Sequence, residues 1–316
     1  MTTQTPGVSV TVPVSQALDR VKEVLFRPFD LGKWFTIGFC AWLAYLGEGG
    51  GGGGGGNYNF GERHGTGNVR HEFEHARDYI ADNLFWIAPV AIALVTIGIA
   101  LWLLFIWLSS RGKFMFLHCV ALNKAEVVLP WKKFASVANS LFWFRIVLGL
   151  IGMVVILPVI GLGVFAGIQM GMGHGWMIQG ILGLIGLGFL TLALLLAFKL
   201  VSKFTMDFVV PIMFLRGKRC VEAWREFWEL LTANVGHFAL YILFQIVLSI
   251  VIGVIVLMIV LVTCCCAGCL LAIPYVGTVF FLPVLVFNRA YSLHYFAQYG
   301  PSYDVFPPVA PPAAAA

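Results

Sequence analysis

Long runs of apolar residues alternate along this chain with short segments that carry nearly all of its charge. A helix that crosses a bilayer needs about 20 apolar residues, within a range of about 17 to 25. The runs that meet or approach this length are Leu84–Leu108, Ile146–Ile168, Ile178–Phe198, Phe238–Val262 and Leu270–Phe287. A shorter run, Trp34–Leu46, reaches span length only if Phe29–Lys33 continues the same helix. The pattern therefore predicts six membrane-spanning helices.

The composition agrees with a bilayer environment. Hydrophobic residues make up 60% of the chain, charged residues 11%, and the mean hydropathy is +0.90. The apolar runs are continuous and do not alternate at every second residue, as the strands of a transmembrane β-barrel would, and such strands are only about 9 to 11 residues long. We therefore expect an all-α membrane protein with a single transmembrane domain over residues 1–300.

The distribution of Lys and Arg predicts the orientation in the membrane, because cytoplasmic loops carry an excess of both. Seventeen of the 20 basic residues fall on the side of the predicted spans that includes the N-terminal segment and the C-terminal tail. The other side holds Arg63, Arg70 and Arg77 together with six acidic residues. Both termini should therefore be cytoplasmic, and the uncharged start of the chain predicts no cleavable signal.

An amphipathic segment precedes the first, third and fifth predicted spans. In the last of these segments Trp224, Phe227 and Leu231 share one helical face, and charged residues occupy the other. Basic, aromatic helices of this kind lie in the headgroup layer of a membrane. The residues expected to contact lipid headgroups are Trp131, Lys132, Lys133, Trp224 and Arg225.

These segments suggest a threefold repeat of tandem helical hairpins, each preceded by an interfacial helix. The repeat units would span residues 13–112, 122–203 and 215–300. The alternative is that any membrane protein built from hairpins places basic aromatic helices on its cytoplasmic face. Residues 47–83, which include eight consecutive glycines at Gly49–Gly56, should form an extracytoplasmic loop, and the Pro- and Ala-rich residues 301–316 a disordered tail.

Two motifs contain residue types that bind metals, but the residues around them do not favour a metal site. His71 and His75 enclose an H-E-x-x-H sequence, which on a buried helix can bind zinc. Here charged neighbours crowd it, so a charged helix that leads into the next span is the main alternative. The cluster Cys264–Cys269 lacks paired C-x-x-C spacing and is expected to pack as small apolar residues. We expect no bound cofactor.

Asp207 is the most informative polar residue, because an acid near the membrane must be paired or face water. Lys203 lies one helical turn before it and offers a local ion pair. The alternative is a substrate or proton site that Asp207 shares with Arg289. His118 and His294 follow a basic residue at the same spacing, Lys113 and Arg289 respectively, and are further candidate binding residues.

Three segments carry a resemblance to a known family: Leu25–Gly56, Asp207–Pro211 and Phe287–Tyr291. Over roughly residues 10–300 the chain resembles an uncharacterised family of bacterial multi-pass integral membrane proteins. In hairpin layout alone it is similar to the membrane domain of some glycerophosphodiester phosphodiesterases. The resemblance implies a bacterial cytoplasmic-membrane address and no known activity.

The leading functional hypothesis is a non-enzymatic membrane module that organises lipid or a partner protein, in which a second copy of the chain is one possible partner. Its cytoplasmic basic surface suits anionic headgroups, not nucleic acid. The alternative is a small-solute transporter that uses Asp207 and Arg289. A more remote alternative is a membrane metalloprotease that uses His71 and His75.

Overall fold

The computed structural model describes residues 8–47, 84–171, 177–263 and 273–306, and within these ranges the secondary structure is entirely helical. The N-terminal elements are α1 (Val12–Val21), η1 (Lys22–Phe26), α2 (Leu31–Tyr45) and α4 (Leu84–Leu122). The central elements are α5 (Val128–Lys133), α6 (Ala135–Gly171), α7 (Met177–Phe204), η2 (Thr205–Val209) and α8 (Val210–Arg216). The C-terminal elements are α9 (Cys220–Ala233), α10 (Val235–Val262), α12 (Pro274–Phe280), α13 (Leu282–Ala297) and η3 (Pro301–Tyr303).

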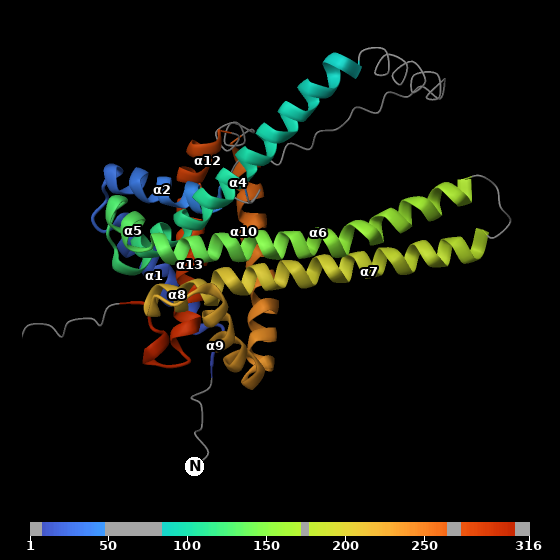
Figure 1. Ribbon diagram of the computed structural model, residues 1–316. Coiled ribbons are helices and arrows are strands. Elements are labelled where there is room, and N and C mark those ends of the chain that lie inside the picture. The colour runs from blue at the N-terminus through green and yellow to red at the C-terminus, as the bar shows by residue number, and fades with distance from the viewer. Residues whose placement is uncertain (1–7, 48–83, 172–176, 264–272, 307–316) are drawn as a thin grey trace, which may run out of the picture.

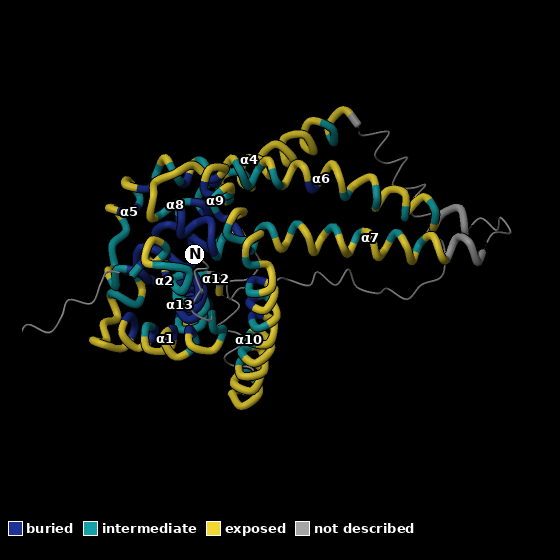
Figure 2. Tube along the Cα trace, turned by 90° about the horizontal axis from the view of Figure 1, so that it is seen from below, coloured by how far each residue is buried: buried dark blue, intermediate teal, exposed yellow. Residues whose placement is uncertain are grey.

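Four long helices project from a body made of the shorter elements (Figure 1). Helices α6 and α7 lie side by side as a hairpin, whereas α4 and α10 leave the body in other directions. The stretches that are long and apolar enough to cross a membrane are Phe85–Leu122, Ala135–Gly167, Leu182–Arg216 and Val235–Val262. Outside the body their residues are largely exposed (Figure 2), as expected of helices whose solvent is lipid.

In the structure, the helices that correspond to the first and last predicted spans are each shorter than a membrane-spanning helix. Helix α2 has 15 residues. The last segment divides into α12, with 7 residues, and α13, with 16. The break falls at Phe281, where ψ is −1°, and Pro283 cannot donate a backbone hydrogen bond to continue the preceding turn. Among the described residues, four of the six predicted spans therefore have the necessary length.

The ends of the long helices are buried together in an aromatic core. Phe208 lies at its centre, stacked on Phe227 with ring centroids 5.2 Å apart and edge-on to Phe238 at 5.1 Å. Tyr241 and Tyr295 complete the cluster, with centroids 4.6 Å apart. Each such pair contributes about 0.5–1.5 kcal/mol beyond the burial of its area, so η2, α9, α10 and α13 hold one another in place.

The two ends of the chain pack against each other in the body. The side-chain amide of Gln298 forms two hydrogen bonds with the backbone of Ser9, at 2.8 and 2.9 Å. Helix α12 packs on α2, where Trp34 Nε1 donates to the Val279 carbonyl at 3.1 Å. Helices α6 and α7 pack against each other, whereas the last predicted span packs against the first and joins the two ends of the chain.

Residues 301–306 belong to the segment that the sequence places in a disordered tail. In the structure Pro301–Tyr303 forms η3, and Tyr303 and Phe306 pack on α13. The Tyr303 ring lies 4.8 Å from that of Phe296, and the Phe306 ring stacks on His294 at 4.1 Å. The proline content favoured disorder, but the aromatic residues between the prolines provide area to bury. The remainder of the tail and most of the glycine-rich loop, including His71 and His75, lie outside the described residues.

Gly112 is where α4 crosses α2 most closely. A Cβ atom at this position would lie 2.5 Å from the backbone of Leu43 and Ala44, which cannot move as a side chain can. We predict that Gly112→Ala destabilises the protein by about 1–3 kcal/mol, the usual cost of overpacking. Thermal melting in detergent measures the effect. Gly98→Ala on the same helix is the matched control, because a Cβ there meets nothing within 4 Å; equal melting of the two variants would contradict the close crossing.

Candidate functional site

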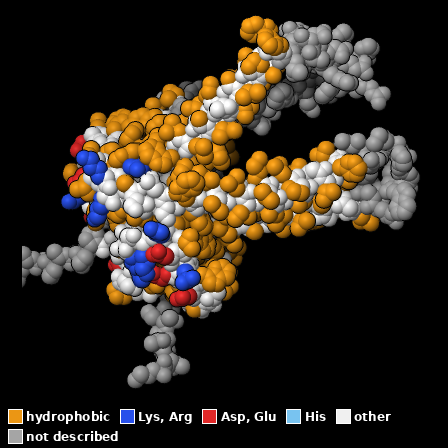
Figure 3. Space-filling model, in the orientation of Figure 1, with side chains coloured by type: hydrophobic (Ala, Val, Ile, Leu, Met, Phe, Trp, Pro, Cys, Tyr) orange, Lys and Arg blue, Asp and Glu red, His pale blue; other side chains and the backbone are white. Residues whose placement is uncertain are grey.

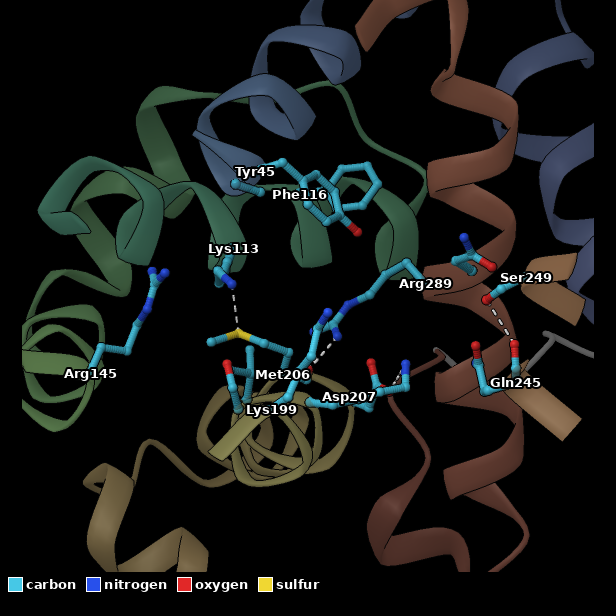
Figure 4. A pocket seen from close by; sticks show the side chains of 15 residues that line it. Tyr45, Lys113, Phe116, Arg145, Lys199, Met206, Asp207, Gln245, Ser249 and Arg289 are labelled. Atoms are coloured by element: carbon cyan, nitrogen blue, oxygen red, sulfur yellow. Dashed lines mark hydrogen bonds and ion pairs between the residues drawn. The ribbon is translucent and has the colours of Figure 1, made fainter. Parts of the chain in front are cut away.

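A cavity of ≈ 540 Å³ lies where the long helices enter the body (Figure 4). Every long helix contributes to its wall: Lys113 from α4, Arg145 from α6, Lys199 and Lys203 from α7, and Gln245 from α10. Residues from α2, η2, α8 and α13, Asp207 and Arg289 among them, complete the wall. The cavity thus joins residues up to 245 positions apart, from Ala44 to Arg289.

The local backbone of η2 shapes one side of this cavity. Thr205–Val209 forms a π-helical turn, and Pro211 follows in the first turn of α8. Proline has no N–H and its ring crowds the carbonyl four residues earlier, so an ordinary α-helical ladder cannot run through this point. The Met206 carbonyl accepts a hydrogen bond from Arg289 Nη1 at 2.6 Å. The irregular turn therefore presents both a backbone acceptor and the Asp207 carboxylate to the cavity.

Asp207 has two partners within the described structure. Its Oδ2 lies 2.9 Å from Lys203 Nζ, the local ion pair expected from the sequence. The same oxygen accepts a hydrogen bond of 3.0 Å from the Tyr241 hydroxyl. Gln245 Nε2 in turn donates to the Tyr241 oxygen at 3.2 Å. Sequence reasoning missed Tyr241, because an aromatic residue at the start of an apolar helix gives no signal of a polar role.

Arg289 lines the same cavity as Asp207 and is 9% exposed. Its Nη1 bonds to the Met206 carbonyl, as described above, and Lys113 Nζ lies 2.8 Å from the Met206 sulfur. Figure 4 shows Lys113 and Arg289 reaching η2 from different sides. The two residues proposed from sequence as a shared site are thus brought to one cavity, while the ion pair of Asp207 is with Lys203.

The charge of the cavity wall is strongly positive. Its cationic residues are Lys113, Arg145, Lys199, Lys203 and Arg289, against the single carboxylate of Asp207. Arg145 Nη1 donates to the hydroxyls of Ser109 and Ser110 at 3.2 and 3.4 Å, so its guanidinium has a defined position. A cavity lined by one sign of charge attracts a ligand of the opposite sign. Arg and Lys donors suit phosphate and carboxylate oxygens.

The two candidate histidines lie away from this cavity. His118 is buried against the rings of Phe134 and Phe214, and its Nε2 lies 3.6 Å from a carboxylate oxygen of Glu126. His294 stacks on Phe306 between α1 and the end of the chain. Burial lowers the pKa of His294 to about 4, and Arg20 contributes to that lowering. His294 is therefore neutral near pH 7 and acts as a packing residue.

The residues expected to contact headgroups divide into two groups. Trp131 packs edge-on against Trp107, and the Arg111 guanidinium lies over both rings, 4.8 and 4.5 Å from the respective centroids. Trp224 Nε1 donates to Thr205 Oγ1 at 3.1 Å. Both tryptophans are therefore partly buried against protein. The residues left exposed are Lys132, Lys133 and Arg225.

No group of three or more His, Cys, Asp or Glu side chains that could hold a metal ion occurs among the described residues. Cys40 and Cys119 are buried with their sulfur atoms 3.8 Å apart. The described site is therefore best characterised by its cations, its single carboxylate and its apolar wall.

Comparison with known proteins places the chain in a family. Residues 9–300 match a family of unknown function, DUF7544. The chain belongs to this family. The match extends from before α1 to beyond α13, so this DUF7544 region contains every residue that lines the cavity. No curated protein and no solved structure matches. The expectation of an uncharacterised family is confirmed, and its bacterial and membrane character remains a prediction.

Asp207 and Tyr241 should be energetically coupled. We predict that Asp207→Asn costs at most about 1 kcal/mol, because the amide oxygen still accepts from the tyrosine and the lost ion pair is partly exposed. Asp207→Ala should cost about 1–3 kcal/mol, because it leaves the fully buried Tyr241 hydroxyl without its acceptor. In the Tyr241→Phe background that extra cost should disappear. Thermal melts of the wild type, Asp207→Ala, Tyr241→Phe and the double variant measure the coupling. Additive losses of stability in the double variant would contradict it.

Proposed function

We propose that this chain is a non-enzymatic module of the bacterial cytoplasmic membrane that holds anionic lipid at the inner leaflet. The observation that carries the proposal is the separation of charge from apolar surface (Figure 3). Lys and Arg gather on the body, and the projecting helices α6 and α7 are covered by apolar side chains. Anionic lipids of the cytoplasmic leaflet attract basic segments at about 1 kcal/mol per Lys or Arg.

The proposal includes six membrane crossings with both termini in the cytoplasm. Each long helix has one end buried in the body, with residues such as Phe114, Leu141, Phe204 and Phe238. The body also contains α1 and the end of α13. If the body lies on one side of the membrane, the chain must cross once between α1 and α4 and once between α10 and α13. The segments available for these crossings are α2 and the stretch formed by α12 and the first part of α13, and α12 packs on α2.

Reporter fusions test this topology. We expect a reporter inserted in Gly49–Gly56 and a reporter fused after Ala316 to lie in opposite compartments. A periplasm-specific enzyme such as alkaline phosphatase should be active only at the first position, and a cytoplasm-specific fluorescent protein only at the second. Activity of the same reporter at both positions would contradict an odd number of crossings between them.

The exposed lysines of α5 test the lipid function. Electrostatic attraction to an anionic surface is lost when the charge is reversed, so Lys132→Glu with Lys133→Glu should lower the preference for phosphatidylglycerol over phosphatidylcholine by about half or more. Spin-labelled lipids in reconstituted vesicles measure that preference.

The matched control reverses Arg70 and Arg77, which the topology places on the other side of the membrane. This control should keep the wild-type preference. An unchanged preference in the Lys132 and Lys133 variant would mean that α5 serves only to support the fold.

A transporter for small anions is the second candidate. It is favoured by one observation: Asp207 and Arg289 share a cavity beside an interrupted helix, as coupling residues of secondary transporters do. Uptake of a labelled anion into vesicles, abolished by Arg289→Gln, would favour this candidate. The metalloprotease hypothesis depends on His71 and His75, which lie outside the described residues.

A further inference from the structure

A second hollow lies beside the basic cavity, between α6 and α7. This groove has a volume of ≈ 450 Å³, and its wall is mainly apolar, with Leu148, Met153 and Phe198 among its residues. It runs along the part of α6 and α7 that is long and apolar enough to cross a membrane. The groove therefore faces the environment that hydrocarbon chains occupy.

The groove and the basic cavity are adjacent and share two lining residues. Arg145 of α6 and Ser202 of α7 line both of them. Figure 4 places Arg145 at one side of the cavity, on the helix that carries the groove. One end of the combined site thus presents cations and the other presents apolar side chains, which is the polarity of a single phospholipid molecule.

Two glycines keep the groove open. A Cβ atom added at Gly149 would meet nothing within 4 Å, and one added at Gly152 would first meet the Phe198 ring at 3.6 Å. The two positions lie three residues apart and so share one face of α6. Larger side chains at either position would occupy the space between α6 and α7 that the groove now provides.

We propose that the combined site binds one anionic glycerophospholipid, with its phosphate among Arg145, Lys199 and Arg289 and one acyl chain along Gly149 and Gly152. The charge of the wall selects the anionic headgroup, and the apolar groove selects a long-chain lipid over a free phosphate. Basic pockets between transmembrane helices on the cytoplasmic side are suited to anionic headgroups. This inference rests on the proposed function, because a site for one lipid molecule requires that the protein lies in a membrane and holds anionic lipid there.

Asp207 has a defined part in this arrangement. Its carboxylate pairs with Lys203, so the cation nearest to it is already neutralised. The phosphate then meets Arg145 and Lys199 at the end of the cavity that opens to the groove. The headgroup is thereby directed toward α6 and α7, where its acyl chain can enter.

Native mass spectrometry of the full-length protein, released from vesicles of phosphatidylglycerol and phosphatidylcholine, tests the proposal. We expect one phosphatidylglycerol to remain bound to the wild type. Lys199→Gln with Arg145→Gln should weaken its retention by about tenfold or more, because charge-assisted hydrogen bonds are lost. Gly149→Leu should weaken retention by several-fold, because the leucine side chain takes up space that the acyl chain would fill, and the excluded chain loses its packing contacts with the groove wall.

Matched controls distinguish this site from nonspecific adhesion of lipid to the apolar helices. Gly98→Leu adds the same side chain to an open face of α4 and should leave retention unchanged. Inorganic phosphate and a phosphatidylglycerol with short acyl chains should compete poorly with the long-chain lipid. Equal retention of phosphatidylcholine, full competition by inorganic phosphate, or unchanged retention in both site variants would overturn the proposal.

Failure of this site is distinguishable from failure of the proposed function. The Lys132→Glu and Lys133→Glu variant should lose surface preference for anionic lipid yet keep the tightly bound molecule. If wild-type protein shows the surface preference but retains no lipid, only the specific site is wrong. If it shows neither, the lipid function itself is wrong.

Discussion

The cost of charge in hydrocarbon determines the arrangement of this protein. A charged side chain at the centre of a bilayer costs about 2.5–3.5 kcal/mol even by insertion measurements, and more when it cannot reach the interface. The long helices respond by carrying their basic residues near the ends that enter the body, as Lys113, Arg145 and Lys199 do. Because the long helices converge in the body, these cations line one cavity, and this gives the candidate site its positive charge.

The body supports this convergence with aromatic packing. Phe208 on η2 contacts rings from α9, α10 and α13, so the irregular turn that carries Asp207 is fixed on several sides. Hydrogen bonds from Gln245 to Tyr241 and from Tyr241 to Asp207 also hold the Asp207 carboxylate in place. A cavity whose wall is held by a rigid core can present charges at fixed positions, which is what selective binding of an anion requires.

Much of the fold could be predicted from the sequence, because long apolar runs have few alternatives to a helix in lipid. The Lys203–Asp207 pair was also predictable, since the two residues lie one helical turn apart. The pairing of α2 with α12 was not, because it depends on contacts between residues such as Trp34 and Val279 that only the tertiary fold brings together. The apolar run Leu84–Leu108 also gives no sign that α4 continues to Leu122, where Arg111 lies over the rings of Trp107 and Trp131. Arg145 and Lys199 contributed to the sequence analysis only as charges that orient the chain, because no local pattern indicates that the fold brings them to one cavity.

The central claim is that the basic cavity and the groove between α6 and α7 form one lipid site. An experimental density map of the protein in native-membrane nanodiscs tests it most directly. We expect a phosphate-sized feature among Arg145, Lys199 and Arg289 that continues as a tube of density past Gly149 and Gly152. An empty groove, or α6 and α7 packed together with Phe198 filling it, would contradict the claim.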